Sequence, residues 1–224
     1  RSLTGHEKEG TAFHEAGHAI IGIKFPNANK VQKITIIPRG NAGGYVLSTP
    51  EDDRFTYTRN ELIAEIVGFL GGRSSEETFF DDISSGAQND IEQATHIARL
   101  MVCELGMSEL GPIQYERNTG SVFLGRDYTQ NQSNFSLATA EKIDNEVRRI
   151  IEEAHQISRK VIEENRDDVT LIAQTLLKHE QITAEEIDYL LANRHLKRDE
   201  VEIVETPSDE TPETKVEEST ETKE

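Results

Sequence analysis

The 224-residue sequence has one cysteine, no long apolar run and few basic residues. Because Cys103 is the single cysteine, an internal disulfide is excluded, and the sequence is compatible with a reducing compartment. Its apolar helical neighbours predict a small buried side chain, not a nucleophile. No apolar stretch approaches the roughly 18 residues that cross a bilayer, and no signal-peptide pattern is expected at the start. Neither a G-x-x-x-x-G-K-[ST] loop nor a G-x-G-x-x-G motif occurs, so an ATP-driven step would need residues outside this sequence.

The charge balance is strongly acidic, with a formal net charge of −18. Because binding to a phosphate backbone needs clustered lysine and arginine, we expect no nucleic-acid partner. Residues 199–224 hold eleven acidic and two basic side chains among Thr, Pro and Ser, with almost nothing apolar. This composition predicts a disordered acidic tail that serves mainly to keep the chain in solution, with partner binding as the alternative.

The segment from His14 to His18 reads His-Glu-Ala-Gly-His, an H-E-x-x-H pattern within a predicted helix. Positions four apart return to nearly the same helix face, so His14 and His18 can bind one ion. Glu15 is offset by one residue, so its carboxylate can reach a water on that ion. Zn²⁺ lowers the pKa of such a water to about 7, and Glu15 can then take its proton. The alternative is a chance match on a polar helix face. An adjacent apolar stripe and the interior Gly17, which indicates close packing, favour the zinc site.

Hydrophobic periodicity predicts a mainly α fold with one small β-hairpin or sheet. Two strands are expected, over Val31–Ile37 and over Tyr45–Leu47. Helices are predicted over about 7–24, 136–163 and 168–178. A capping box at Thr58 predicts a helix that runs toward Phe79 with an interruption at Gly71-Gly72, and a second capping box at Thr183 predicts a last helix. A further helix is expected from a Ser85 cap to about Gly106. The long connection over 107–135 holds a strand-like segment at Ser121–Leu124 and is either functional or mobile.

The first predicted strand suggests a role in substrate binding. A strand beside a zinc helix can hold an extended peptide by offering unpaired backbone groups, which assigns Ile34, Thr35, Ile36, Ile37 and Pro38 to the substrate. The alternative is a hairpin that only covers the core.

Spacing alone does not identify the third protein ligand that a catalytic zinc needs. The candidates downstream of the histidines are acids and one further histidine: Glu76, Glu77, Asp81, Asp82, Asp90 and His96. A carboxylate at a helix end, such as Glu76 or Glu77, would gain from a metal, whereas Asp90 is already favoured by its helix N-terminus.

Five motifs in order resemble the peptidase domain of the FtsH-type AAA zinc proteases over about residues 7–192. They are the zinc helix, Ile34–Gly40 with Gly43-Gly44, Gly71–Arg73 with Glu76-Glu77, Ser85–Asp90 with Ala94-Thr95, and Val122–Arg126. The resemblance implies that Asp90 is the third ligand to one Zn²⁺ per subunit, leaving Glu76 and Glu77 with structural or supporting roles. It divides the chain into linker or cloning residues 1–6, a zinc metallopeptidase domain over 7–198 and an acidic tail over 199–224.

The resemblance also implies a larger protein. Such proteases carry an N-terminal membrane anchor and an ATPase module, which alone uses ATP, before the peptidase domain. They form homo-hexamers that degrade unfolded membrane and soluble polypeptides processively at the cell membrane, with this domain facing the cytoplasm. The sequence is therefore expected to be the peptidase module alone, with any membrane contact made through the missing anchor. Two other functions are weighed: a non-catalytic assembly module with a structural zinc site, and a zinc hydrolase that acts on something other than peptides.

Overall fold

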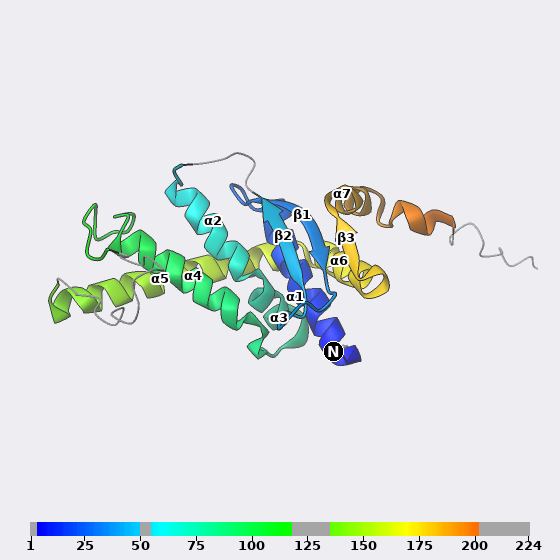
Figure 1. Ribbon diagram of the computed structural model, residues 1–224, viewed down its shortest axis with the longest axis horizontal. Coiled ribbons are helices and arrows are strands. Elements are labelled where there is room, and N and C mark those ends of the chain that lie inside the picture. The colour runs from blue at the N-terminus through cyan, green and yellow to red at the C-terminus, as the bar shows by residue number, and fades with distance from the viewer. Residues whose placement is uncertain (1–3, 50–54, 118–134, 202–224) are drawn as a thin grey trace, which may run out of the picture.

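The computed structural model describes residues 4–49, 55–117 and 135–201 (Figure 1). The described residues form seven α-helices, two short 3-10 segments and one three-stranded sheet. The helices are α1 (Gly5–Lys24), α2 (Arg59–Phe69), α3 (Gly71–Phe80), α4 (Gln88–Cys103), α5 (Leu137–Glu164), α6 (Arg166–His179) and α7 (Ala184–Asn193); the 3-10 segments are η1 (Ser85–Ala87) and η2 (Lys197–Asp199). The expected mainly α fold with one small sheet is confirmed. Two of the sequence-based predictions, the strand-like Ser121–Leu124 and the motif Val122–Arg126, lie outside the described residues, as does the acidic tail from residue 202 onward.

Helix α1 is the centre of the domain. It packs against α3 and α6 and lies under the sheet (Figure 1). The predicted apolar stripe is buried, with Ala12, Ala16, Ala19 and Ile20 inaccessible to solvent. The helix begins two residues earlier than expected because Thr4 caps it, accepting a hydrogen bond from the Glu7 amide in a capping box.

The sheet has the order β2-β1-β3, with both pairings antiparallel. The expected hairpin consists of β1 (Lys30–Thr35) and β2 (Tyr45–Thr49). The third strand, β3 (Gln181–Thr183), was not predicted, because three residues between two helices give too short a pattern. It pairs with Lys33–Thr35 of β1, which leaves β2 as an edge strand among the described residues.

The long helix α5 carries the framework on which the other helices pack. Side by side with α4, it runs along the long axis of the molecule (Figure 1) and also contacts α2 and α3. Ile143, Ile150 and Ala154 on its predicted apolar face are buried, but Leu137 at its first turn is 91% exposed. Ser136 caps the helix, accepting a hydrogen bond from the Thr139 amide. The helix therefore packs into the core along all but its first turn.

The connection from α3 to α4 differs from the prediction. Ser84, not Ser85, is the cap residue: its hydroxyl accepts a hydrogen bond from the Gly86 amide and starts the 3-10 segment η1. Helix α4 then begins at Gln88 and ends at Cys103, three residues before the expected end. The buried position of Cys103, and a pKa that burial raises to about 11, agree with its predicted role as a small apolar side chain.

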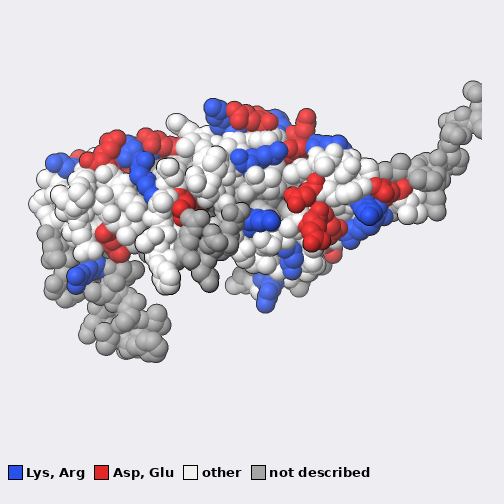
Figure 2. Space-filling model, turned by 90° about the horizontal axis from the view of Figure 1, so that it is seen from above, with Lys and Arg blue, Asp and Glu red and all other residues white. Residues whose placement is uncertain are grey.

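Charged side chains of both signs are mixed on one face of the molecule (Figure 2). Figure 2 shows acidic and basic residues interspersed over the face seen from above. In the described part of the chain, no helix combines the length and the apolar character that crossing a bilayer requires.

Candidate metal centre

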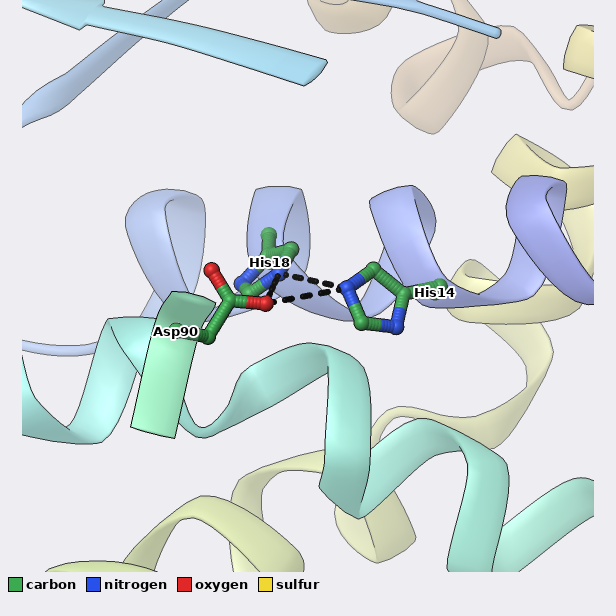
Figure 3. A group of neighbouring side chains, drawn as sticks. All are labelled: His14, His18 and Asp90. Carbon is green, nitrogen blue, oxygen red and sulfur yellow. Dashed lines mark hydrogen bonds and ion pairs between the residues drawn. The ribbon is translucent and has the colours of Figure 1, made fainter. Parts of the chain in front are cut away.

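His14 and His18 lie one turn apart in the buried middle of α1 and point to the same place. Their Nε2 atoms are 3.0 Å apart, and the rings meet edge to face. Asp90 reaches them from the first turn of α4, with Oδ2 3.1 Å from each Nε2 atom (Figure 3). Among the described residues, these three form the one group of histidine, cysteine or acidic side chains whose ligand atoms converge closely enough for a metal ion.

The orientation of His18 is fixed from behind by α2. Its Nδ1 lies 2.8 Å from the carbonyl oxygen of Gly68. Since a carbonyl only accepts, Nδ1 carries the proton and donates it, which leaves a lone pair on Nε2 when the ring is neutral. This backbone partner is the kind of outer contact that orients a metal-binding histidine.

His14 is held by close contact with α3. A Cβ atom added at Gly72 would lie 2.3–2.6 Å from three atoms of the His14 ring, so only glycine leaves room for it. On its other side, Nδ1 of His14 is 3.9 Å from Oε1 of the buried Glu76. The Ser84 hydroxyl donates a hydrogen bond to that same Oε1, while Oε2 of Glu76 is buried with no hydrogen-bond partner. Glu76 thus faces the back of His14 and not the shared ligand position.

The helix crossing behind the histidines also depends on glycine. A Cβ atom at Gly17 would lie 2.4 Å from the Gly71 carbonyl oxygen and 2.6 Å from Cβ of Ser75. The Ser75 hydroxyl further joins the two helices by donating to the Phe13 carbonyl at 2.7 Å. The close packing expected at Gly17 is confirmed. The Gly71-Gly72 pair separates α2 from α3, and Gly71 makes the close contact with Gly17.

The three converging groups perturb one another strongly. Burial disfavours the charged form of His18, but the hydrogen bond and charge of Asp90 and the nearby Glu15 raise its pKa to about 9. Burial opposes ionisation of Asp90 as well, yet its hydrogen bonds to both histidines hold the pKa of the carboxyl well below its usual range. No lysine or arginine ion-pairs with Asp90 among the described residues, so a cation other than a side chain fits the site.

The donor set and its size fit zinc. Two imidazole nitrogens and one carboxylate oxygen form a set of three protein ligands, as in catalytic zinc sites with an open fourth position. The three ligand atoms form a triangle with sides of 3.0–3.1 Å. A tetrahedral zinc with bonds of about 2.0–2.1 Å would set its ligands about 3.3 Å apart, so little movement is needed to hold the ion.

Glu15 lies beside this triangle without belonging to it. It is buried, and burial raises the pKa of its carboxyl, while His18 and His14 oppose the shift. Its Cγ would lie 3.0 Å from a Cβ atom at Gly44, so the absence of a side chain there lets the β2 segment pass directly over it. Glu15 therefore faces both the metal position and the sheet edge.

The remaining candidates for the third ligand lie elsewhere. Glu77 pairs with His155 and Arg159 of α5. Asp81 ends α3 in a left-handed conformation, and Asp82 and His96 are exposed. Of the candidates that spacing left open, the structure brings only Asp90 to the two histidines.

The site opens into a cleft of about 1170 Å³. One wall is the segment Asn41–Val46 with Ser48, which includes the edge strand β2, and the floor is α1. The opposite wall comes from α2 and from the connection between α3 and α4. An extended chain laid in this cleft would pass Glu15 and the three converging ligands.

The peptide-binding role of Ile34–Pro38 stays a prediction, but its premise of unpaired backbone groups along β1 does not hold. Both edges of β1 are occupied, by β2 and by β3, and the Ile36 amide donates to the Glu180 carbonyl. None of Ile34, Thr35, Ile36, Ile37 and Pro38 lines the cleft. The sequence could not reveal this, because the occupying strand β3 is nearly 150 residues away. In the part of the chain that the structure describes, β2 has the unpaired edge beside the cleft.

Comparison with known proteins places this geometry in context. Residues 1–190 match the model of peptidase family M41. The chain is 51% identical over 197 residues to the ATP-dependent zinc metalloprotease FtsH of Acholeplasma laidlawii, covering 88% of this chain and 31% of that protein. It is 48% identical over 193 residues to the protein of the same name from Bacillus subtilis, covering 85% and 30%. The chain thus spans less than a third of these relatives.

Proposed function

This chain belongs to peptidase family M41, and we propose that it is the zinc-dependent proteolytic portion of a longer ATP-dependent protease. The observation that supports this most strongly is the convergence of His14, His18 and Asp90 beside Glu15, in a cleft large enough for a polypeptide. The names of its relatives identify them as zinc metalloproteases.

In the proposed mechanism, His14, His18 and Asp90 hold one zinc ion. The bound ion supplies a Lewis acid that lowers the pKa of a water to about 7 and polarises the scissile carbonyl. Glu15 accepts the proton of the attacking water. Glu15 can then donate that proton to the leaving amine. Because Nδ1 of His18 donates to the Gly68 carbonyl, Nε2 is the nitrogen of the neutral ring that would coordinate the ion.

We propose that the substrate lies antiparallel to β2, whose outer edge is unpaired among the described residues and which forms a wall of the cleft. The added strand would pass Glu15 at Gly44. N-methylation of individual peptide amides tests this. We expect methylation at alternating positions to reduce kcat/KM about 3- to 10-fold each, because one net hydrogen bond contributes about 0.5–1.5 kcal/mol. Equal cleavage of every methylated peptide would show that no strand forms.

The catalytic assignment is tested by separating metal binding from proton transfer. Glu15→Gln should keep one zinc per chain yet lose about 10²–10⁴-fold in cleavage of a fluorogenic peptide. His14→Ala should lose zinc as well. Glu9→Gln, an exposed change of the same kind on the same helix, serves as the matched control and should behave as the native chain. Native turnover by Glu15→Gln would disprove its role as general base. Zinc retention without any peptide cleavage by the native chain would favour a structural zinc site or a different hydrolytic substrate.

The wider role is also a proposal. We infer that the longer protein adds a membrane anchor and an ATPase module, assembles as a homo-hexamer and degrades unfolded polypeptides processively at the cytoplasmic side of the cell membrane. The support is the resemblance and the fraction of each relative that this chain covers. We expect this chain to cleave short peptides without ATP and to leave a stably folded protein intact, whereas the longer protein with ATP should degrade both.

A further inference from the structure

The end of the cleft beyond His18 is built from α1 and α2. Its walls are mainly apolar and come from Ile21, Gly22, Ala64, Gly68 and Phe69. One carboxylate, that of Glu65, also lines this end. Glu65 lies three positions before Gly68, whose carbonyl binds His18, and helix residues three apart share a face. Glu65 is therefore on the side of α2 that faces the metal centre.

Glu65 has no ion pair with any described residue, although it is only partly exposed. Burial and the charge of Glu61, one turn away, raise the pKa of its carboxyl. Both effects disfavour the charged form of Glu65. A cation bound next to the carboxylate would offset them, because an opposite charge stabilises the ionised form. The Glu65 carboxylate thus has no cationic partner among the described residues, whereas the Glu77 carboxylate pairs with His155 and Arg159.

The charge of the whole cleft acts in the same direction. Six acids line it, namely Glu7, Glu15, Glu65, Glu76, Asp82 and Asp90, while no lysine or arginine does among the described residues. A zinc dication would offset only part of this charge. On the sheet wall, Nζ of Lys33 lies over the ring of Tyr45, 5.6 Å from its centroid, and Lys33 and Arg39 lower the pKa of the Tyr45 hydroxyl. A substrate lysine or arginine would therefore be attracted to the cleft and an acidic residue repelled.

We propose that Glu65 is a specificity residue that binds the side chain of a lysine or arginine close to the scissile bond of the substrate. The partly exposed Phe69, with the buried Ile21 and Ala64 behind this wall, suits the methylene stem of such a side chain, and the carboxylate suits its charged end. This inference rests on the proposed peptidase function and adds to it a preference among peptides.

The test uses the zinc-loaded chain and internally quenched peptides of one common frame. Lysine, glutamine or glutamate is placed in turn at each of three positions on either side of the scissile bond, and mass spectrometry verifies the cleaved bond. The readout is the ratio of kcat/KM for the lysine peptide to that for the glutamine peptide. At one position we expect a ratio of about five for the native chain, as for a partly exposed ion pair. Glu65→Gln should bring the ratio to about one, and Glu65→Lys should make glutamate the preferred residue at that position.

Glu61→Gln is the matched control, because it removes the same charge one turn away on α2 but outside the cleft lining. It should keep the native ratio. Cleavage with an unchanged ratio in both Glu65 variants would overturn this inference and leave the peptidase function standing. An equal loss of preference in Glu61→Gln would also overturn it, because the cause would then be the general field. Failure of the zinc-loaded native chain to cleave any peptide would instead refute the peptidase function itself.

Discussion

Two aspartates interact with the same helix in opposite ways. Near the C-terminal end of α1, Asp168 of α6 pairs with Lys24 and with Arg194, so its charge is balanced by side chains. In the middle of α1, Asp90 meets two imidazoles and no lysine or arginine among the described residues. The first cluster is complete without any ligand, and its two cations hold the Asp168 pKa low against burial. In the second cluster, two imidazole nitrogens and a carboxylate oxygen direct their lone pairs to one place, where a metal ion can bind them. The comparison shows how one helix combines a structural ion pair with a coordination site.

The largest expected effect comes from exchanging each aspartate for asparagine. Asp90→Asn should weaken zinc binding by at least about 100-fold, since even outer partners of a ligand account for about 10–100-fold, and peptide cleavage should fall in parallel. Asp168→Asn should leave both unchanged. Competition with a chelator of known affinity measures the zinc binding. Equal zinc affinities of Asp90→Asn and Asp168→Asn would show that the two clusters do not differ in metal binding.

The next effect tests how His14 is positioned. Gly72→Ala should displace the His14 ring, because a new Cβ atom would lie within 2.3–2.6 Å of it. We expect zinc affinity to fall about 10- to 100-fold. Gly10→Ala, in the same helix as His14 but with nothing within 4 Å, should keep zinc affinity and stabilise the fold by about 0.5–1 kcal/mol. Native zinc affinity in Gly72→Ala would show that the ring has other room.

Adjacent acids on α3 distinguish support of His14 from surface pairing. Glu76→Gln removes the buried charge 3.9 Å from Nδ1 of His14 and should weaken zinc binding about tenfold. Glu77→Gln, which affects only the pairing with α5, should not change zinc binding. If Glu77→Gln weakened zinc binding as much as Glu76→Gln, the effect would reflect packing of α3 and not the orientation of His14.

The smallest effect concerns the pH dependence of the complete cluster. The pKa of folded Asp168 is lowered, so its pairing stabilises the fold above the unfolded pKa of about 3.9 and the contribution is lost as the pH falls through the folded value. Because Lys24 and Arg194 are partly exposed, Asp168→Asn should cost about 1 kcal/mol at pH 7. Urea unfolding should show this deficit shrinking below about pH 4. A deficit independent of pH would assign it to packing.

Much of this structure was accessible from local patterns. The histidine pair and the capping residues Thr58 and Thr183 each depend on neighbours within a few positions, whereas the start of α1 and both ends of α4 differ from the prediction. Asp90 was different: spacing offered six candidates, and only family resemblance chose one before the fold showed which carboxylate meets the histidines. The pairing of β3 with β1 was not predictable, because it joins segments nearly 150 residues apart. For the same reason the sequence assigned the substrate edge to β1, whereas among residues 4–49, 55–117 and 135–201 the unpaired edge is that of β2.

The central claim is that one zinc ion is held jointly by α1 and α4. Crystals of the chain grown with zinc, with diffraction recorded on both sides of the zinc absorption edge, test it most directly. We expect one anomalous peak per chain, about 2.0–2.1 Å from Nε2 of His14, Nε2 of His18 and Oδ2 of Asp90. A peak coordinated by Glu76 in place of Asp90, or none at the histidines despite excess zinc, would contradict it.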